Sequence, residues 1–333
     1  MGLVDEREAL AARIRRFVTH ASGDFDELAL AVHRFQVRHD PVQRALAEGT
    51  EVSGWRAIPA VPVDLFKDLP VGTVGDDERA VVFRTSGTTQ TRRGAHRVRD
   101  TALYDLGAQA WHQRCVPGAP TRVVALLQDP LVAPDSSLSH MVAGFGDVTW
   151  CVGADGLDAR VALEALTHGG PVYVCATAFA LAELLEREVS PLPAGSVVMV
   201  TGGFKGRRTD LSEAGLYARI HGTLAPERLI REYGMTELSS QLWAHGDAPY
   251  RPPPWLRPLA VDPATGAPRG AEAAGQLRFV DLCNLDSAVA IETLDQGVVH
   301  ADGSLTLMGR LPGAEVRGCS LTVEELQRRR EGR

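Results

Sequence analysis

Short β-rich segments alternate with helical segments along the middle of this chain, and this alternation limits its fold more than any other feature. Strands that alternate with helices usually pair in parallel, because each helix carries the chain back to the start of the next strand. The sequence therefore predicts an α/β fold with a largely parallel sheet. The predicted strands are Ala80 to Phe83, Arg122 to Leu127, Val172 to Cys175 and Ser196 to Thr201, and the helical segments include Ala159 to Leu166 and Phe179 to Glu188.

The two flanking regions differ from this pattern. Residues 5 to 50 predict two or three amphipathic packing helices, since apolar residues recur near helical spacing. They are Leu10, Ile14 and Phe17, then Leu28, Leu30, Val32 and Phe35. After Glu237, the proline-rich stretch Tyr250 to Pro258 precedes short segments divided by turn signals, which predicts a smaller β subdomain. The turn signals are Pro263 to Gly266, Asp286 and Asp302-Gly303, and a last helix is predicted at Val323 to Arg330.

The composition excludes several classes of protein. Over 333 residues, 44% are hydrophobic and 23% charged, which is typical of a folded globular chain. A net charge of −7 is opposite in sign to surfaces that bind nucleic acid, so we expect no nucleic-acid partner. No apolar run is long enough for a membrane span, and five cysteines without a CxxC pair predict neither a disulfide framework nor a zinc site. A cytoplasmic protein is expected.

The segment after the strand predicted at Ala80 to Phe83 is rich in hydroxyl groups and glycine. It reads Thr85-Ser86-Gly87-Thr88-Thr89, and Arg92 and Arg93 follow it. Successive backbone amides and hydroxyls in a tight loop form a nest for phosphate oxygens. Ser86, Gly87, Thr88 and Thr89 are therefore candidate phosphate ligands, although the GKS or GKT of a P-loop is absent and a plain turn is the alternative.

Two later motifs predict the rest of a nucleotide site. In Tyr233-Gly234-Met235-Thr236-Glu237, an aromatic ring can stack on a base, a glycine permits close approach and a carboxylate can hold Mg²⁺. The alternative is a strand end with a solvated glutamate. Asp295, with Gly309-Arg310 after it, offers two carboxylate oxygens to the two hydroxyls of a ribose.

In this order the three motifs resemble those of the adenylate-forming superfamily, which includes acyl-CoA synthetases, peptide-synthetase adenylation domains and firefly-type luciferases. The family's TSGTTGxPKG loop corresponds to Thr85 to Gly94, and its YGxTE motif corresponds to Tyr233 to Glu237. The aspartate of its TGD motif corresponds to Asp295. Its hinge GR corresponds to Gly309-Arg310, and its KxRG motif corresponds to Glu315 to Gly318. Over residues 1–310 the resemblance implies the large N-terminal domain of these enzymes, with mixed α/β sheets and a small β subdomain, and with ATP and Mg²⁺ as cofactors. It implies roles for Ser86, Thr88 and Thr89 at the phosphates, Glu237 at Mg²⁺, Tyr233 and Gly202-Gly203 at the adenine and Asp295 at the ribose.

Within the superfamily the chain is most similar to the LuxE-type acyl-protein synthetases. The segments that carry this similarity are Ile58 to Pro62 with Phe66-Lys67, Thr201 to Arg207, Tyr233 to Leu238 with Ser240-Gln241, and Asp281-Leu282 with Asn284 to Asp286. The similarity implies that the acyl group passes to a cysteine, here Cys319 after Gly318, and then to a reductase, an amine or a carrier. Only 23 residues follow Arg310, so residues 311–333 are expected to be a short remnant of the C-terminal lid.

The lid of ordinary members carries a catalytic lysine, and a substitute is therefore expected elsewhere. Only Lys67 and Lys205 are lysines among 35 cationic residues, and a lysine kept in an arginine-rich chain indicates a site that needs a compact ammonium. Lys205, close to Gly202-Gly203, is the candidate. With Arg310 and Cys319 it completes the predicted catalytic residues.

The substrate is expected to be a small carboxylic acid, with His140, Leu238 and Trp243 as candidate contacts. Trp150 and Trp243 would favour an aryl or medium-length acid over a long fatty chain if both face inward. Two other functions stay open. One is a compact CoA ligase of the phenylacetate type, and the other is a nucleotide-binding scaffold of a reductase complex.

Overall fold

The computed structural model describes residues 2–74, 79–85, 92–203 and 211–311. They form two compact units, which we treat separately. Unit 1 consists of the chain up to Ala110, of Met235–Gln241 and of the chain from Arg251 onward, and unit 2 of Trp111–Gly234 and Leu242–Tyr250. In the part of the chain that the structure covers, no helix is both long and apolar enough to cross a membrane.

Unit 2 is built on a sheet of seven of the described strands, in the order β10-β9-β8-β7-β4-β5-β6. The five central strands pair in parallel, and β10 and β6 pair antiparallel at the two edges. The prediction of a largely parallel sheet is therefore confirmed. The strands are β4 (Arg122–Gln128), β5 (Asp147–Gly153), β6 (Gly156–Leu157), β7 (Tyr173–Thr177), β8 (Val197–Thr201), β9 (Arg228–Tyr233) and β10 (Leu242–His245).

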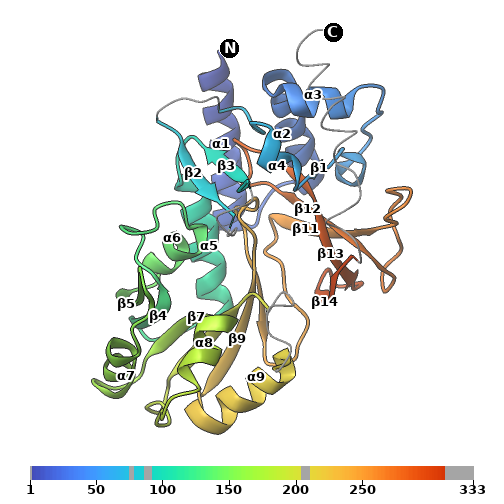
Figure 1. Cartoon of the computed structure of the whole chain (residues 1–333). Coiled ribbons are helices and arrows are strands. Elements are labelled where there is room, and N and C mark those ends of the chain that lie inside the picture. Colours follow the sequence, from blue (N-terminus) through green and yellow to red (C-terminus); the bar gives the residue numbers. More distant parts are fainter. Residues whose placement is uncertain (1, 75–78, 86–91, 204–210, 312–333) are drawn as a thin grey trace. The chain divides into compact units, whose positions relative to one another are not determined.

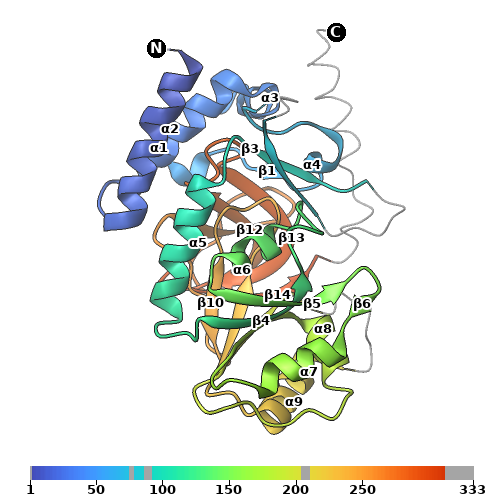
Figure 2. The same cartoon turned by 90° about the vertical axis from the view of Figure 1, so that its left-hand side faces the viewer.

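Alternating side chains give the sheet two different faces. Val124, Val174 and Val198 point to one face, where they form a core with α7, α8 and α9 (Figure 2). The opposite face carries Tyr173, which stacks with His112 and Phe145. The helices of this region are α6 (Ser137–Ala143), α7 (Ala159–Thr167), α8 (Ala178–Leu184), α9 (Glu213–Arg219) and the short η2 (Ile220–Leu224).

The first elements of unit 1 are the predicted packing helices. They are α1 (Leu3–His20), α2 (Phe25–His39) and α3 (Pro41–Ala47), and they lie side by side (Figure 1). Asp24 caps α2 by accepting a hydrogen bond from the Glu27 amide, and Asp40 caps α3 by accepting one from the Val42 amide. Ile14, Val32 and other apolar residues of the predicted pattern are buried, so the prediction is confirmed.

The predicted small β subdomain belongs to unit 1 and includes a strand from much earlier in the chain. β1 (Val61–Pro62) pairs in parallel with β13 (Ala290–Val299), which also pairs with β12 (Ala274–Asp281) and β14 (Leu305–Arg310). β11 (Leu256–Val261) pairs with β12. A separate hairpin joins β2 (Val81–Arg84) to β3 (Ala95–Val98). The remaining elements are η1 (Trp55–Ala57), α4 (Leu65–Asp68) and α5 (Ala102–Cys115).

Candidate functional site

In unit 1 the predicted metal carboxylate, Glu237, lies against the base of the predicted phosphate loop. The amide of Thr85 donates to the carbonyl oxygen of Gly94 at 3.0 Å, and the amide of Gly94 donates back to Oγ1 of Thr85 at 2.9 Å, which closes the loop base. A Cβ on Gly94 would lie 3.4 Å from Oε1 of Glu237. Glycine at position 94 therefore leaves the space in which this carboxylate sits.

A buried histidine ties the Glu237 segment to the same hairpin. Nδ1 of His96, on β3, lies 2.5 Å from the carbonyl oxygen of Thr236. A carbonyl can only accept, so Nδ1 is the donor. Burial lowers the pKa of His96 to about 4, and the imidazole is therefore neutral at physiological pH. Sequence reasoning missed His96, because Ala95, His96 and Val98 of β3 are all buried and only Arg97 is half-buried, so the strand has no clear alternation.

Polar side chains from the end of β12 and from the loop after it hold the rest of the segment 235–241. Asn284 accepts from the Ser239 amide at 2.8 Å and donates to the Glu237 carbonyl oxygen at 2.8 Å. Asp281 accepts from the Ser240 hydroxyl at 2.8 Å and from the Ser239 amide at 3.1 Å. Burial raises the pKa of Asp281 to about 6. Three hydrogen bonds to its backbone and one to the Ser240 hydroxyl thus hold the segment that carries Glu237 to two buried side chains.

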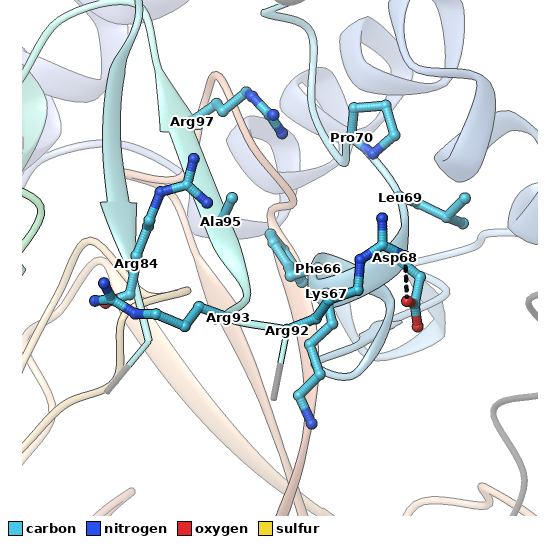
Figure 3. Close-up of a pocket in the computed structure, with 10 residues that line it drawn as sticks. All are labelled: Phe66, Lys67, Asp68, Leu69, Pro70, Arg84, Arg92, Arg93, Ala95 and Arg97. Atoms are coloured by element: carbon cyan, nitrogen blue, oxygen red, sulfur yellow. Dashed lines mark hydrogen bonds and ion pairs between the residues drawn. The ribbon is translucent and has the colours of Figure 1, made fainter. Parts of the chain in front are cut away.

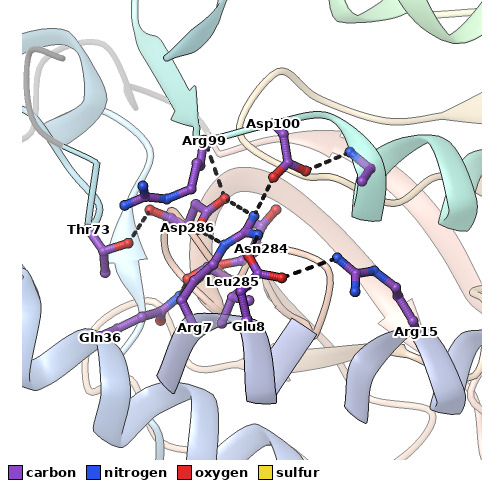
Figure 4. Close-up of polar contacts among 11 residues, drawn as sticks. Arg7, Glu8, Arg15, Gln36, Thr73, Arg99, Asp100, Asn284, Leu285 and Asp286 are labelled. Carbon is purple, nitrogen blue, oxygen red and sulfur yellow. Dashed lines mark hydrogen bonds and ion pairs between the residues drawn. The ribbon is translucent and has the colours of Figure 1, made fainter. Parts of the chain in front are cut away.

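The same loop is anchored to the N-terminal helices (Figure 4). Arg7 of α1 is buried and forms a bidentate ion pair with Asp286, with Nε at 2.9 Å from Oδ1 and Nη2 at 2.8 Å from Oδ2. Gln36 of α2 donates to the carbonyl oxygens of Asn284 at 2.7 Å and Leu285 at 3.0 Å. Asn284 to Asp286, which carry part of the similarity to LuxE-type proteins, therefore link α1 and α2 to the segment that bears Glu237.

In unit 1 the candidate ribose residue Asp295 contacts Arg310, which was predicted to be catalytic. Asp295 on β13 and Arg310 on β14 face one another in the antiparallel register, and Nε of Arg310 donates to Oδ1 of Asp295 at 3.1 Å. The Arg310 side chain is 55% exposed and that of Asp295 17%. The pair is therefore partly exposed to solvent, and the ribose role of Asp295 stays a prediction.

The candidate adenine residues belong to unit 2, at the carboxyl ends of β8 and β9. Gly202 directly follows β8 and has φ +67°, a left-handed conformation that favours glycine. At Gly203 a Cβ would lie 2.9 Å from Oε1 of Glu213, so the end of that side chain would have to shift. Tyr233 ends β9, and the exposed Gly234 follows it. Ligands bind at such strand ends in parallel sheets.

A buried glutamate beside these residues, Glu232, was not predicted from the sequence. Glu232 is 4% exposed, and its Oε2 accepts a hydrogen bond from Oγ1 of Thr201, its register partner on β8. Burial raises the pKa of Glu232 to about 7, and the Thr201 hydrogen bond opposes the rise. The alternation along β9 placed Glu232 on the same face as buried Ile230, which was the available signal.

The residues predicted to contact the carboxylic acid substrate are distributed over both units. Leu238 in unit 1 and Trp243 in unit 2 are each 1% exposed. Trp243 packs against His112 and Phe145 with ring centroids 5.5 and 6.2 Å apart, so its indole belongs to the aromatic core of unit 2. His140, on α6, is half-buried.

A basic pocket of about 410 Å³ lies beside the β2–β3 hairpin in unit 1 (Figure 3). Its lining combines α4 and the residues after it with side chains of the hairpin. The cationic side chains are Lys67, Arg84, Arg92, Arg93 and Arg97, and the other lining residues are Phe66, Asp68, Leu69, Pro70 and Ala95. Arg92, Arg93 and Lys67 stand out in the sequence, but their positions there do not predict that they line one pocket.

Several predicted residues lie outside the described part of the chain. They are Ser86, Gly87, Thr88 and Thr89 of the phosphate loop, the candidate catalytic residues Lys205 and Cys319, and the predicted helix Val323 to Arg330. Of the described cysteines, Cys115 is half-buried, and Cys151, Cys175 and Cys283 are buried. Burial raises the pKa of Cys151 to about 12 and also raises the pKa of Cys175 and Cys283, as the predicted packing role requires.

The donor set around Glu237 fits magnesium better than a transition metal. Among the described residues no group of three or more His, Cys, Asp or Glu side chains is arranged to hold a metal ion. Mg²⁺ is usually held by one or two carboxylates together with phosphate oxygens and water. A single carboxylate at the base of a phosphate-loop motif meets that requirement.

The fold resembles that of solved adenylate-forming enzymes. 2-Hydroxyisobutyryl-CoA ligase, in the postadenylation state with 2-HIB-AMP, has a TM-score of 0.67 and 15% identity over 86% of this chain and 68% of the ligase. O-succinylbenzoate coenzyme A synthetase (MenE) from Bacillus subtilis, with ATP and magnesium, has a TM-score of 0.52 and 15% identity over 70% of this chain and 51% of MenE. Apo MatB from Rhodopseudomonas palustris has a TM-score of 0.51 and 13% identity, over 69% and 48%.

These similarities show that the chain has the mixed α/β fold of the N-terminal domain of adenylate-forming enzymes. The chain spans about half the length of MatB and MenE. No protein-family model matches the sequence, and no curated protein sequence matches it. The fold expected from the motifs is therefore confirmed by structure alone.

Proposed function

We propose that this protein uses ATP to activate a carboxylic acid as an acyl-adenylate. One observation carries the proposal: the His96–Thr236 hydrogen bond spans 140 residues and joins the hairpin of the phosphate-loop motif to the segment of Glu237. Two motifs of a nucleotide site are thereby brought together by buried contacts. A scaffold protein that catalyses no reaction would not require a carboxylate beside a phosphate-loop motif.

In the reaction, a carboxylate oxygen of the substrate attacks the α-phosphorus of ATP. The bond from oxygen to the α-phosphorus forms as the bond from that phosphorus to the bridging oxygen breaks, and pyrophosphate leaves with the electron pair. Ser86, Gly87, Thr88 and Thr89 hold the phosphates. Lys205 stabilises the charge that develops on the α-phosphate.

Glu237 is proposed to hold Mg²⁺, which when bound neutralises phosphate charge. The neutral His96 and Asn284 keep the Glu237 backbone in place before ATP arrives, so that no reorganisation is needed during the reaction. Asp295 accepts hydrogen bonds from the ribose hydroxyls, and Arg310 orients Asp295. Tyr233 and Gly202-Gly203 border the adenine, and Gly234 and Thr236 are further proposed contacts to the nucleotide. His140, Leu238 and Trp243 are the proposed contacts to the acid.

For the second step we propose that the acyl group passes to the thiolate of Cys319. The sulfur attacks the acyl carbonyl carbon, the carbon–sulfur bond forms, and the bond to the phosphate oxygen breaks with release of AMP. The position of Cys319 after Gly318 of the motif that follows the hinge supports this acceptor. Coenzyme A is the competing acceptor, and the similarity in fold to CoA ligases favours it. An acceptor protein such as a reductase or a carrier would take the group from Cys319.

Exchange of labelled pyrophosphate into ATP, measured with a panel of carboxylic acids, tests the first step. Exchange should require an acid, and Glu237→Gln should lower it at least about a hundredfold if the metal contributes several kcal/mol. Exchange at the wild-type rate in this variant would contradict the proposal that Glu237 holds the metal. Intact mass spectrometry with and without coenzyme A then separates the acceptors: an adduct absent from Cys319→Ser supports Cys319, whereas a free CoA thioester without an adduct contradicts it.

A further inference from the structure

Glu213, the first residue of α9, lies close to one of the two glycines proposed to border the adenine. A Cβ on Gly203 would be only 2.9 Å from Oε1 of Glu213, so this carboxylate oxygen occupies the space beside the Gly203 backbone. Ser212 caps α9 by accepting a hydrogen bond from the Gly215 amide at 3.0 Å, which fixes the start of the helix from which Glu213 extends. Glu213 itself is exposed to solvent.

Aromatic side chains of unit 2 surround the same place. The guanidinium carbon of Arg231 is 6.0 Å from the centre of the Tyr217 ring, on α9, and 4.8 Å from the centre of the Tyr250 ring. The rings of Tyr250 and Tyr233 meet edge to face, with their centroids 6.0 Å apart. Burial, with the Glu213 carboxylate adding to its effect, raises the pKa of Tyr217 to about 12 and also raises the pKa of Tyr250. Glu213 therefore belongs to the same group of side chains as Tyr233.

We infer that Glu213 accepts a hydrogen bond from the amino group at position 6 of adenine and so selects adenine nucleotides over those of guanine and hypoxanthine. This role rests on the proposed function, in which Tyr233 and Gly202-Gly203 border the adenine. A carboxylate can only accept a hydrogen bond, and the amino group of adenine is a donor. Guanine and hypoxanthine carry a carbonyl oxygen at the same position, which a carboxylate repels. Glycine at position 203 lets a flat base approach the backbone beside this carboxylate.

Calorimetric titration of the full chain with ATP and with inosine triphosphate (ITP) measures this selection independently of activity. Both titrations contain Mg²⁺ and no acid, and the two nucleotides share their ribose and phosphates. We expect the wild type to bind ATP at least about tenfold more tightly than ITP. In Glu213→Gln the amide keeps an acceptor for the amino group and adds a donor for the carbonyl oxygen, so the ratio of the two Kd values should fall below about three. Glu164→Gln, a change at an exposed glutamate of α7, should keep the wild-type ratio.

A second variant, Glu213→Ala, separates the attraction to ATP from the repulsion of ITP. It removes the acceptor that ATP uses and also the charge that ITP meets. ATP should therefore bind at least about threefold more weakly than to the wild type, whereas ITP should bind no more weakly. A thermal unfolding curve for each variant shows that it is folded.

The possible results distinguish this role from the proposed function. Equal binding of ATP and ITP by the wild type, or a ratio that Glu213→Gln leaves unchanged, overturns the role of Glu213. An equal loss of affinity for both nucleotides also overturns it, because Glu213 would then act on the ribose, the phosphates or the fold. Acid-dependent pyrophosphate exchange together with any of these results leaves the proposed function intact. Selection of ATP that depends on Glu213, without adenylation of any acid, would support the role of Glu213 and refute the proposed function.

Discussion

The Nδ2 atom of Asn284 donates a hydrogen bond of 2.8 Å to the carbonyl oxygen of Glu237. The same amide group donates to the Ala288 carbonyl oxygen at 3.0 Å, and its oxygen accepts from the Ser239 amide. Asn284 is fully buried, so these bonds do not compete with water. The position of the candidate metal carboxylate thus depends on a side chain 47 residues away.

We predict that Asn284→Asp lowers pyrophosphate exchange by about tenfold or more, through kcat. The substitution keeps the size and the acceptor for Ser239 but turns an oxygen toward the carbonyl oxygens of Glu237 and Ala288, which repel it. Gln36→Met is the matched control, because it removes bonds to the same loop without touching Glu237. If both variants lose stability and activity in the same proportion, Asn284 has only a structural role.

Gly94→Ala should reduce exchange by about tenfold and raise the Mg²⁺ concentration needed for half-maximal rate. The new Cβ would lie 3.2 Å from Cγ2 of Thr85 and 3.4 Å from Oε1 of Glu237, so one of these groups must move. Gly270→Ala is the control, since a Cβ there has no neighbour within 4 Å. If the Mg²⁺ concentration needed for half-maximal exchange is unchanged in Gly94→Ala, the proposal that Glu237 holds the metal is contradicted.

Arg310→Gln should raise the KM for ATP about tenfold and change the free energy of unfolding by less than about 1 kcal/mol. An exposed ion pair contributes little to stability, whereas a charged partner that orients Asp295 toward a ligand contributes to binding. Arg269→Gln removes a comparable exposed pair, that with Asp262 at 2.8 Å, and should leave KM unchanged. Steady-state kinetics and urea unfolding measure the two effects. A variant with lower stability and normal KM would contradict the ribose role.

The pKa of Glu232, raised by burial from 4.5 to about 7, predicts a stability that falls with rising pH. Between these two values the folded carboxyl keeps its proton while the unfolded carboxyl has lost it, so the folded state loses stability as pH rises toward 7. Glu232→Gln should remove this loss, and its stability relative to wild type should rise by roughly 3 kcal/mol from pH 4 to pH 8. Urea unfolding at several pH values, with Glu164→Gln on α7 as the surface control, measures the difference. A difference that does not change with pH would show that Glu232 is ionised in the fold.

Much of the secondary structure could be predicted because it depends on local spacing. The helices within residues 5–50 and the strands near 122–127, 172–175 and 196–201 follow from which apolar residues recur at which interval. The helix predicted at 179–188 is confirmed with an earlier end, at Leu184. Strand β5 and strand β9 were missed, because β5 has only one buried residue, Cys151, and β9 buries a glutamate, Glu232.

Of the candidate site, the sequence by itself determined the residue types and their order. Tyr233 to Glu237 and Asp295 were singled out by their residue types and by a motif order that resembles the adenylate-forming superfamily, and Arg310 by that resemblance. Ser86 to Thr89, Lys205 and Cys319 stay predictions outside the described residues. Only the tertiary structure decided that Thr236 contacts His96 and that Glu237 lies against Gly94. It also decided that Arg84 and Arg97 share one hairpin face and that the Glu232 carboxyl is buried. The physical reason is that these properties depend on strand register and on contacts between segments more than a hundred residues apart, which the local pattern of a sequence does not contain.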